Sequence, residues 1–310
     1  MGGRGLISIE DCVSMEIRNL HKYVSESEEP MLQAVYSENI NAEGRTKDEV
    51  LQERQDSLDS KAMHSVFFKK TEFRDNTSWE WLTKGDLKKA TEGTILAAQE
   101  QAIRVRAIMH RIDKSCPSPL CRLCGQRDET VAHIVAECQS LAQRQYKNWR
   151  HDVVARVLHW ELCKKFKLPH NDRWYEHTPE PSAQNENAKL IWDVTIQTDK
   201  KVDHNKPDIV LIDKTSNFCL IIDVACPFDT RVIEKENEKI TKYQDLKWEL
   251  IKIWKVKTIR VIPIVIGALG TISKAFKEYL MTISKDIHFG TLQKACLLET
   301  ARILRYALSI

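Results

Sequence analysis

The sequence lacks any apolar stretch long enough to cross a lipid bilayer. Its longest apolar run, Val261 to Leu269, contains Pro263 and Gly267 and has about half the length of a spanning helix. The N-terminus also lacks the charged, apolar and small-residue segments of a signal peptide. These two absences predict a protein with no membrane partner and no route of secretion.

A strong net charge is absent as well. The 310 residues include 47 Lys and Arg against 44 Asp and Glu, which leaves a formal net charge of +3. A surplus this small does not indicate a nucleic-acid partner, so any surface that binds phosphate must be local. The hydrophobic fraction of 42% and the charged fraction of 29% are those of an ordinary globular protein, and the length allows two modest domains.

The chain has no signal sequence and yet contains nine cysteines. Outside the secretory pathway, cysteines usually stay reduced or bind metal, and an odd number fits that interpretation better than a set of disulfides. We therefore expect free thiols or metal ligands. The corresponding compartment is the nucleus or otherwise the cytoplasm.

One group of these cysteines has the spacing of a zinc site, C-x2-C-x8-H-x4-C. Its residues are Cys121, Cys124, His133 and Cys138. Four such ligands close a tetrahedral site, so the zinc ion is expected to be structural and not catalytic. On a regular helix His133 and Cys138 would diverge by about 140°, so Cys138 is expected at a helix end or a distorted turn. Cys116 and His151 are the nearest substitute ligands, and the simpler alternative is a set of small core fillers.

A basic helix is expected directly after this group. Between positions 144 and 173 eight basic residues stand against three acidic ones, a net charge of +5. Trp149 and Trp160 lie among them, and basic side chains beside aromatic ones can grip a phosphate backbone and stack on bases. The alternative is a solvated helix face with tryptophans in the core. The residues predicted to bind nucleic acid are Arg144, Lys147, Arg150, Lys164, Lys165 and Lys167.

A β-hairpin is predicted further along the chain. Ile209 to Ile212 and Cys219 to Ile222 are short β-rich runs, and the polar residues 214–217 between them form the turn. If that turn is closed by its first and last residues, Asp208 faces Asp223 across the two strands. Opposed residues have Cβ atoms roughly 4.5 to 5.5 Å apart, so both carboxylates can hold one Mg²⁺ ion.

A charged helix from about residue 232 to residue 254 follows the hairpin, and Lys239 and Tyr243 lie on one of its faces. An amine beside two metal-binding carboxylates can orient water and neutralise phosphate charge, as phosphodiester hydrolysis requires. We therefore predict Asp208, Asp223, Lys239 and Tyr243 as catalytic residues. The simpler alternative is that Asp223 caps the next helix and that Lys239 is only solvated.

Pattern and turn chemistry predict the remaining elements. They are an exposed helix at 47–58, an amphipathic helix at 95–112, a basic helix at 141–166, a linker at 169–187, strands at 191–197 and 258–266, and helices at 273–282 and 291–308. With the hairpin, these elements predict an α/β fold in which helices flank a mixed sheet.

The order and spacing of the predicted catalytic residues resemble a known family. Lys-Pro-Asp at 206–208, then Asp223 after fourteen intervening residues, then Lys239 and Tyr243 resemble the PD-(D/E)XK restriction-like endonuclease at the C-terminus of certain non-LTR retrotransposon polyproteins. The common form of this nuclease has its lysine two residues after the second acid, where this chain has Ala225. In the retrotransposon variant the lysine lies on the following helix, as Lys239 does.

Other segments extend the resemblance over nearly the whole chain. They are GGRGL at 2–6, CRLCGQRDETVAHIVAEC at 121–138, VIPIVIGALGTI at 261–272 and ARIL at 301–304. The resemblance implies a helical, thumb- or linker-like leader over 1–115, a CCHC zinc knuckle and basic helix over 116–175, and a nuclease domain over 176–310. It also implies that the chain corresponds to the downstream part of a longer ancestor. The Asp-Asp pair of a polymerase palm is absent from the sequence, so reverse transcription by this chain alone is excluded.

The activity implied by the resemblance is Mg²⁺-dependent nicking of target DNA for target-primed integration. The implied partners are DNA, element RNA and a reverse transcriptase encoded upstream. Two alternatives stay open: a non-catalytic, zinc-containing nucleic-acid-binding remnant or host-adopted protein, and a structure-selective repair nuclease of the same fold. A further acid near the metal could come from Glu186, Asp193 or Asp199, and the spacing does not choose among them.

Overall fold

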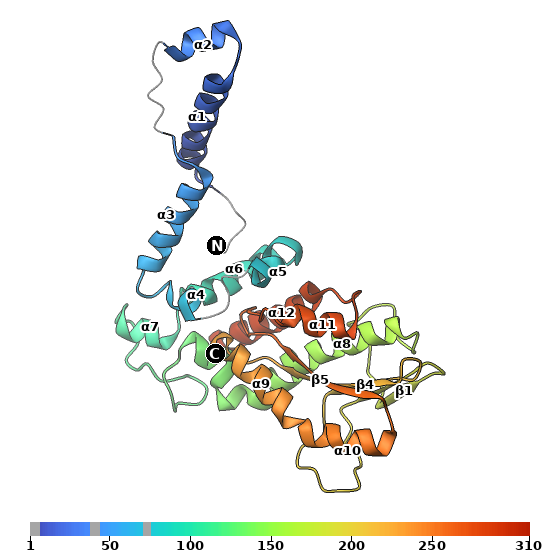
Figure 1. Ribbon diagram of the computed structural model, residues 1–310. Coiled ribbons are helices and arrows are strands. Elements are labelled where there is room, and N and C mark those ends of the chain that lie inside the picture. The colour runs from blue at the N-terminus through green and yellow to red at the C-terminus, as the bar shows by residue number, and fades with distance from the viewer. Residues whose placement is uncertain (1–6, 38–43, 71–75) are drawn as a thin grey trace. The chain divides into compact units, whose positions relative to one another are not determined.

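The computed structural model describes residues 7–37, 44–70 and 76–310. The chain divides into two compact units, Met1–Lys69 and Lys70–Ile310 (Figure 1). Helix α4 (Val66–Lys70) spans the boundary between them. The GGRGL string at 2–6 lies outside the described residues.

The first unit is helical over its described residues. Its helices are α1 (Ile9–Glu26), α2 (Pro30–Ser37) and α3 (Lys47–Ser60). Helix α3 begins with a capping box in which Thr46 and Glu49 satisfy each other's backbone N–H groups. Asp11 on α1 accepts hydrogen bonds from Arg45 and from Arg54 on α3, each at 2.6 Å. Charged contacts therefore connect α1 to α3.

The second unit contains a mixed, open sheet of five strands. They are β1 (Ser182–Gln184), β2 (Ala188–Trp192), β3 (Ile209–Asp213), β4 (Phe218–Ala225) and β5 (Thr258–Val265). The strands are ordered β1-β2-β3-β4-β5, and each neighbouring pair is antiparallel except β4 and β5, which are parallel. The predicted α/β class with a mixed sheet is confirmed.

The predicted hairpin is formed by β3 and β4 in the expected register. Ile209 pairs with Ile222 and Val210 pairs with Ile221, so the next position outward brings Asp208 opposite Asp223. The turn is built by polar groups, because Asp213 Oδ1 accepts hydrogen bonds from the backbone N–H groups of Thr215 and Ser216.

The second unit also contains helices, and some of them cover the two faces of this sheet. The label η marks a 3-10 or π-helical segment. The helices are η2 (Asn76–Trp79), α5 (Glu80–Lys84), α6 (Lys89–Gln99), α7 (Arg106–Arg111), η3 (His133–Glu137), η4 (Gln139–Leu141), η5 (Ala142–His151), α8 (Asp152–Lys165), η6 (Asp229–Arg231), α9 (Val232–Lys242), α10 (Gln244–Trp254), α11 (Phe276–Ile283) and α12 (Phe289–Leu308). None of the helices in the described ranges combines the length and the apolar composition that crossing a membrane requires.

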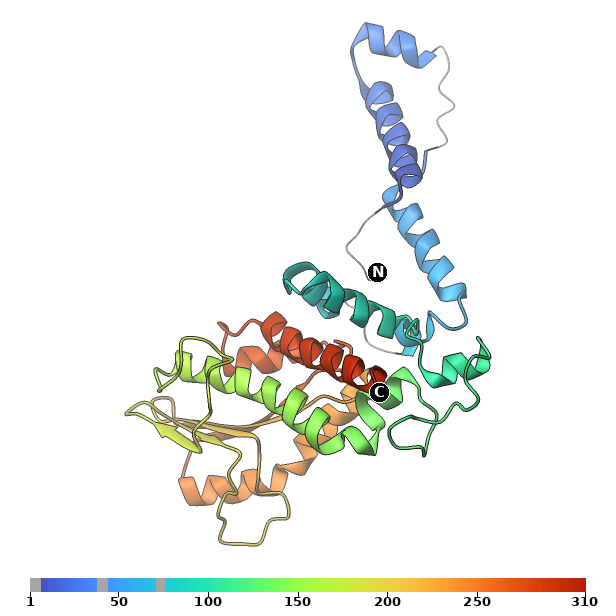
Figure 2. The ribbon, with the colours of Figure 1, turned by 180° about the vertical axis from the view of Figure 1, so that it is seen from behind.

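The two faces of β4 pack against different helices (Figures 1 and 2). Leu220, Ile222 and Val224 lie in the core shared with α8, α11 and α12, whereas Cys219 and Ile221 lie in the core shared with α10. Residues that alternate along a strand point to opposite faces, so β4 is buried on both sides. The predicted strand at 258–266 and the helices at 273–282 and 291–308 are present with ends shifted by a few residues.

Two predicted helices are interrupted. The helix predicted at 232–254 breaks at Tyr243 into α9 and α10, which lets α9 reach the end of β4 while α10 packs on the sheet. The helix predicted at 95–112 ends at Gln99, whose side-chain amide donates to the carbonyl of Leu269, and Gln101 then has a positive φ of 56°. Tertiary contacts override the helical periodicity at both places.

The strand predicted at 191–197 was wrong in its bounds. The structure has β2 over Ala188–Trp192, and the strand stops because Asp193 has a left-handed φ of 47°. The segment at 169–187 was interpreted as a linker, but it contains β1. The sequence of β1, Ser-Ala-Gln, carries no alternating apolar signal, and the strand forms by pairing with β2.

A buried carboxylate closes the loop that follows β5. Asp229 is 2% exposed and accepts hydrogen bonds from the backbone N–H groups of Leu269 (2.8 Å) and Thr271 (2.9 Å). Asp229→Asn places an amide donor against a backbone donor, so we expect the free energy of unfolding to fall by roughly 1 to 3 kcal/mol. Urea denaturation measures this loss, and Asp203→Asn, at an exposed position, is the matched control. Equal stability of the two variants would contradict the prediction.

Candidate active site and metal centre

The structure brings three of the predicted catalytic residues into contact. Asp223 lies near the end of β4 and is 2% exposed. The Tyr243 hydroxyl donates a hydrogen bond of 2.5 Å to Asp223 Oδ1, and Lys239 Nζ on α9 lies 2.5 Å from Asp223 Oδ2. Because the helix breaks between α9 and α10, the Lys239 ammonium and the Tyr243 hydroxyl both contact the buried carboxylate of Asp223.

Tyr243 has the properties of a positioning residue. It is fully buried, and its hydroxyl also lies 3.2 Å from the backbone carbonyl oxygen of Lys206. Burial and the charge of Asp223 raise the pKa of Tyr243 far above its ordinary value, so the phenol keeps its proton. Tyr243 can thus orient Asp223 as a hydrogen-bond donor, but it cannot act as a base near neutral pH.

Asp208 is held at the start of β3 by contacts across the hairpin. Its Oδ2 accepts a hydrogen bond of 2.7 Å from the backbone N–H of Val224 and lies 3.1 Å from His151 Nε2. Burial raises the pKa of Asp208, but the hydrogen bond and charge of His151 outweigh this effect and keep the pKa below its ordinary value. Asp208 is therefore a carboxylate at neutral pH, ready to bind a cation.

His151 belongs to this site, although the sequence indicated it only as a substitute zinc ligand. It lies where η5 meets α8, and its Nδ1 is 2.9 Å from Asp152 Oδ1. Burial lowers the pKa of His151, but Asp152 and Asp208 raise it to about 10. Sequence reasoning missed the role of His151 because its contact with Asp208 joins residues 57 positions apart, and no local pattern encodes such a contact.

The two carboxylates fit a hard divalent cation. Asp223 Oδ2 is buried and accepts no hydrogen bond from the residues that the structure describes; its contact with Lys239 is an ion pair. Carboxylate oxygens are the ligands that Mg²⁺ prefers in proteins. Asp208 and Asp223 would hold the ion. Among the further acids considered, Asp193 pairs with Lys206 and donates its backbone N–H to the carbonyl of Asp208, so it lies beside the site.

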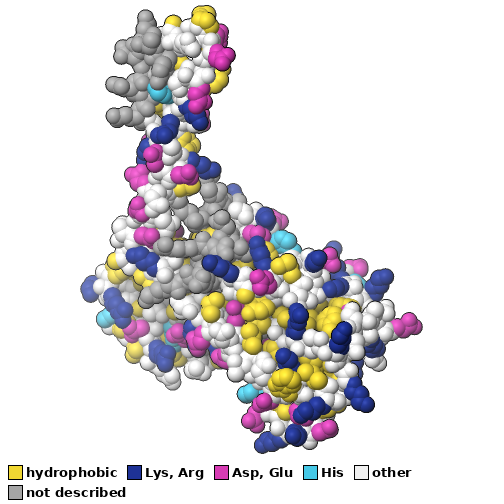
Figure 3. Space-filling model, in the orientation of Figure 1, with side chains coloured by type: hydrophobic (Ala, Val, Ile, Leu, Met, Phe, Trp, Pro, Cys, Tyr) yellow, Lys and Arg dark blue, Asp and Glu magenta, His cyan; other side chains and the backbone are white. Residues whose placement is uncertain are grey.

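A cleft of about 300 Å³ opens beside these residues. The basic residues in its wall are Lys147, Arg150, His151, Lys235 and Lys239. On the face shown in Figure 3, basic and acidic side chains are interspersed over the surface instead of forming one large field of either sign. Positive charge is thus gathered locally at the cleft, where a phosphate group would meet Lys239 beside Asp223.

The residues predicted to bind nucleic acid do not form one surface. Arg150 is 1% exposed and donates to the carbonyls of Val135 (2.7 Å) and Cys226 (3.1 Å), so it holds elements together and does not face solvent. Lys147 lines the cleft, and Arg144 is exposed, with its guanidinium 5.6 Å from the ring of Trp149.

The three other predicted lysines lie at the far end of α8, about 20 Å along the helix from His151. Lys164 Nζ is 4.1 Å from the ring centroid of Trp160, and Lys165 Nζ donates to the carbonyl of Ile283 at 2.6 Å. Lys167 follows the helix with a positive φ of 53°. They therefore form a basic area separate from the cleft.

The predicted zinc ligands converge. The donor atoms of Cys121, Cys124, His133 and Cys138 all lie within 4.8 Å of one another. The Sγ atoms of Cys121 and Cys138 are 3.9 Å apart, and Cys124 Sγ is 3.3 Å from His133 Nε2. These separations are close to the edges of a tetrahedron around zinc, roughly 3.4 to 3.8 Å. Gly125 takes a positive φ of 64° at the knuckle turn. The cluster can hold a zinc ion.

A π-helical turn explains how His133 and Cys138 meet. The segment from His133 to Glu137 is π-helical, and the N–H of Cys138 donates to the carbonyl of His133 at 2.9 Å. This five-residue spacing of the hydrogen bond returns Cys138 to the side of His133, which a regular α-helix would not do. The expected distorted turn is therefore present. The Tyr146 hydroxyl supports it by donating to the Ile134 carbonyl at 2.7 Å.

The segment at 121–138 is attached to the rest of the unit through Arg122, which also forms a buried ion pair within the segment. Arg122 donates to both carboxylate oxygens of Glu129, at 2.8 and 2.9 Å, and Glu129 is fully buried. The same guanidinium donates to the carbonyl of Leu308 at 3.2 Å. Leu308 ends α12, so the zinc knuckle is anchored on the helix that covers the sheet.

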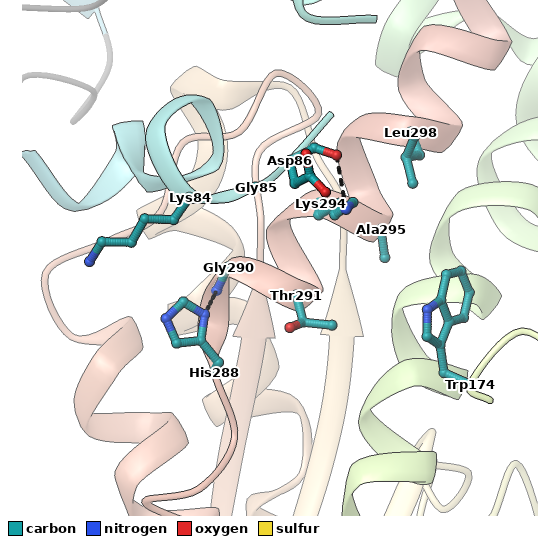
Figure 4. Close-up of a pocket in the computed structure, with 10 residues that line it drawn as sticks. All are labelled: Lys84, Gly85, Asp86, Trp174, His288, Gly290, Thr291, Lys294, Ala295 and Leu298. Carbon is teal, nitrogen blue, oxygen red and sulfur yellow. Dashed lines mark hydrogen bonds between the residues drawn. The ribbon is translucent and has the colours of Figure 1, made fainter. Parts of the chain in front are cut away.

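A second cavity, of about 230 Å³, contains none of the predicted site residues (Figure 4). It lies beside the start of α12, where the Gly290 N–H donates to His288 Nδ1 and Lys294 Nζ donates to the carbonyl of Asp86. The ring of Trp174 lines its other side. We assign no chemistry to this cavity.

The structure thus places two carboxylates and an amine beside a basic cleft. The sequence matches no protein family model and no curated protein.

Proposed function

We propose that this chain is a Mg²⁺-dependent endodeoxyribonuclease that nicks target DNA, as the resemblance to retrotransposon restriction-like endonucleases implies. The observation that carries the proposal is the meeting of Asp208, Asp223 and Lys239 at one end of the β3–β4 hairpin. The simpler alternative, a helix-capping Asp223 and a solvated Lys239, is not favoured, because both side chains are largely buried and contact each other.

Each residue has a separate task in the proposed reaction. Asp208 and Asp223 would hold Mg²⁺, which when bound polarises the scissile phosphate as a Lewis acid. Lys239 orients the attacking water and offsets charge that builds on the phosphate. Tyr243 fixes Asp223, and His151 fixes Asp208. Lys147 and Lys235 in the cleft wall would position the DNA backbone.

The zinc cluster serves this function indirectly. With four protein ligands a zinc ion has no open position for a substrate, so it would hold the fold. The segment η5 follows the cluster and leads to His151 in the active site. We propose that zinc keeps this segment in place against the carboxylates.

A nicking assay on supercoiled plasmid tests the proposed activity. The full chain with Mg²⁺ is expected to convert supercoiled DNA to the open circle, and chelation of Mg²⁺ should stop the conversion. Binding of DNA without any nicking under these conditions would favour the non-catalytic remnant. Nicking restricted to branched or flapped DNA would favour the repair nuclease.

DNA affinity is expected to depend on salt through the cleft lysines. Replacing Lys147 and Lys235 by Gln should lower the slope of log affinity against log salt by about 1.8, since each phosphate contact contributes roughly 0.9. Fluorescence anisotropy at several salt concentrations measures this slope. The comparison variant replaces Lys164 and Lys167 at the far end of α8. A lower slope in the Lys164 and Lys167 variant would show that DNA also contacts the far end of α8. An unchanged slope in the Lys147 and Lys235 variant would show that DNA does not bind in the cleft.

A further inference from the structure

A second cluster of potential metal ligands lies outside the zinc knuckle. His159 and Cys163 are one turn apart on α8, and His177 comes from the connection at 166–181 that leads to β1. Their donor atoms all lie within 4.8 Å of one another. His159 Nδ1 is 2.8 Å from His177 Nε2, and Cys163 Sγ is 3.5 Å from His159 Nδ1.

Burial of this cluster is nearly complete. His159, Cys163 and His177 are 1%, 0% and 3% exposed. His159 Nε2 and His177 Nδ1 have no hydrogen-bond partner among the described residues. Without a metal, burial of two imidazoles and a thiol would cost desolvation free energy and return only one short hydrogen bond, between the two imidazoles.

The donor set matches a borderline-soft cation. Imidazole nitrogen and thiolate sulfur are the usual ligands of zinc, and one cation could take all three donor atoms at once. Burial, together with the charge of Glu180, raises the pKa of the Cys163 thiol to about 12.

We propose that His159, Cys163 and His177 bind a second zinc ion, which ties the connection at 166–181 to α8. As the bond from Cys163 Sγ to zinc forms, the thiol proton passes to solvent. His159 lies eight residues beyond His151, about 12 Å along the helix, so this zinc is separate from the nuclease carboxylates. The inference is independent of the proposed nuclease activity.

Two side-chain hydrogen bonds also hold the connection at 166–181. Trp160 Nε1 donates to the carbonyl of Asn171 at 2.8 Å, and the Asn185 side chain donates to the carbonyl of Phe166 at 2.8 Å. From Asn171 to Pro181 the chain forms turns without a helix or strand. A metal at His177 would therefore determine the path of the segment.

Native mass spectrometry of the full chain, purified without added metal, tests the second site. The parent is expected to carry two zinc ions, and Cys163→Ala is expected to carry one fewer. The matched control is Cys219→Ala, because Cys219 is also fully buried but lies outside both clusters. Its zinc content should equal that of the parent.

Equal zinc content in Cys163→Ala and the parent would overturn the inference. If Cys163→Ala does not fold, His177→Asn, which changes only the connection, replaces it. If neither variant folds, the parent decides: two zinc ions support the site, and a single zinc ion that disappears in Cys124→Ser overturns it. Cobalt substitution gives a further check, because Cys163 would supply about one quarter of the thiolate-to-metal absorption.

Discussion

Asp223→Ala is expected to abolish Mg²⁺-dependent nicking while the chain stays folded and still binds DNA. Without Asp223, Asp208 offers a single carboxylate, and a strongly hydrated Mg²⁺ ion is not held by one such group beside the scissile phosphate. Removal of a negative charge reduces repulsion of the DNA backbone, so affinity should be equal or slightly higher. Plasmid nicking rates and anisotropy on the same preparation measure the two effects.

Two companion variants sharpen this result. Lys239→Ala leaves both carboxylates in place but loses the amine that orients water, so its nicking rate should fall by about 10² to 10⁴. Asp203→Ala removes an exposed acid from the loop before Asp208 and should nick like the parent. If Asp223→Ala nicks as fast as the parent at the same Mg²⁺ concentration, the carboxylates are not the active site and the nucleic-acid-binding alternative is favoured.

The local parts of the site could be read from the sequence because they depend on spacing along one or two segments. The turn at 214–217 determines the hairpin register, and the register places Asp208 against Asp223. The expected distortion between His133 and Cys138 also follows from spacing alone, and the structure supplies it as a π-helical turn. Short-range geometry of this kind is set by the number of residues between two groups.

The parts that sequence reasoning missed depend on packing between distant segments. Amphipathic periodicity at 232–254 gives no sign that the helix must break at Tyr243, because the break depends on tertiary packing: α9 reaches the end of β4 while α10 packs on the sheet. The sequence predicted Arg150 as a DNA-binding residue, but its side chain is buried and donates to the carbonyls of Val135 and Cys226. The resemblance to a nuclease family likewise did not point to His151 at Asp208, since that contact joins two segments predicted as separate modules.

These same contacts connect the zinc cluster to the proposed chemistry. Arg150 donates to the carbonyl of Val135, within the π-helical turn of the cluster, and its neighbour His151 contacts Asp208. Arg150 also donates to Thr300 Oγ1 on α12 at 3.2 Å. A displacement of the turn would therefore remove a partner from a buried guanidinium and shift the histidine that orients a metal-binding carboxylate.

Cys124→Ser is therefore expected to lose one zinc ion per chain, to unfold the knuckle at 121–138 and to reduce nicking strongly. Structural zinc contributes about 10 to 16 kcal/mol in zinc-finger peptides, which is as large as the stability of a whole domain. Native mass spectrometry, limited proteolysis and the plasmid assay measure the three effects. The matched control is Cys116→Ser, whose thiol contacts the carbonyl of Ser118 outside the cluster and should leave zinc content unchanged. Loss of zinc in Cys116→Ser instead would reassign the ligand, and retention of zinc in Cys124→Ser would show that the four residues are core fillers.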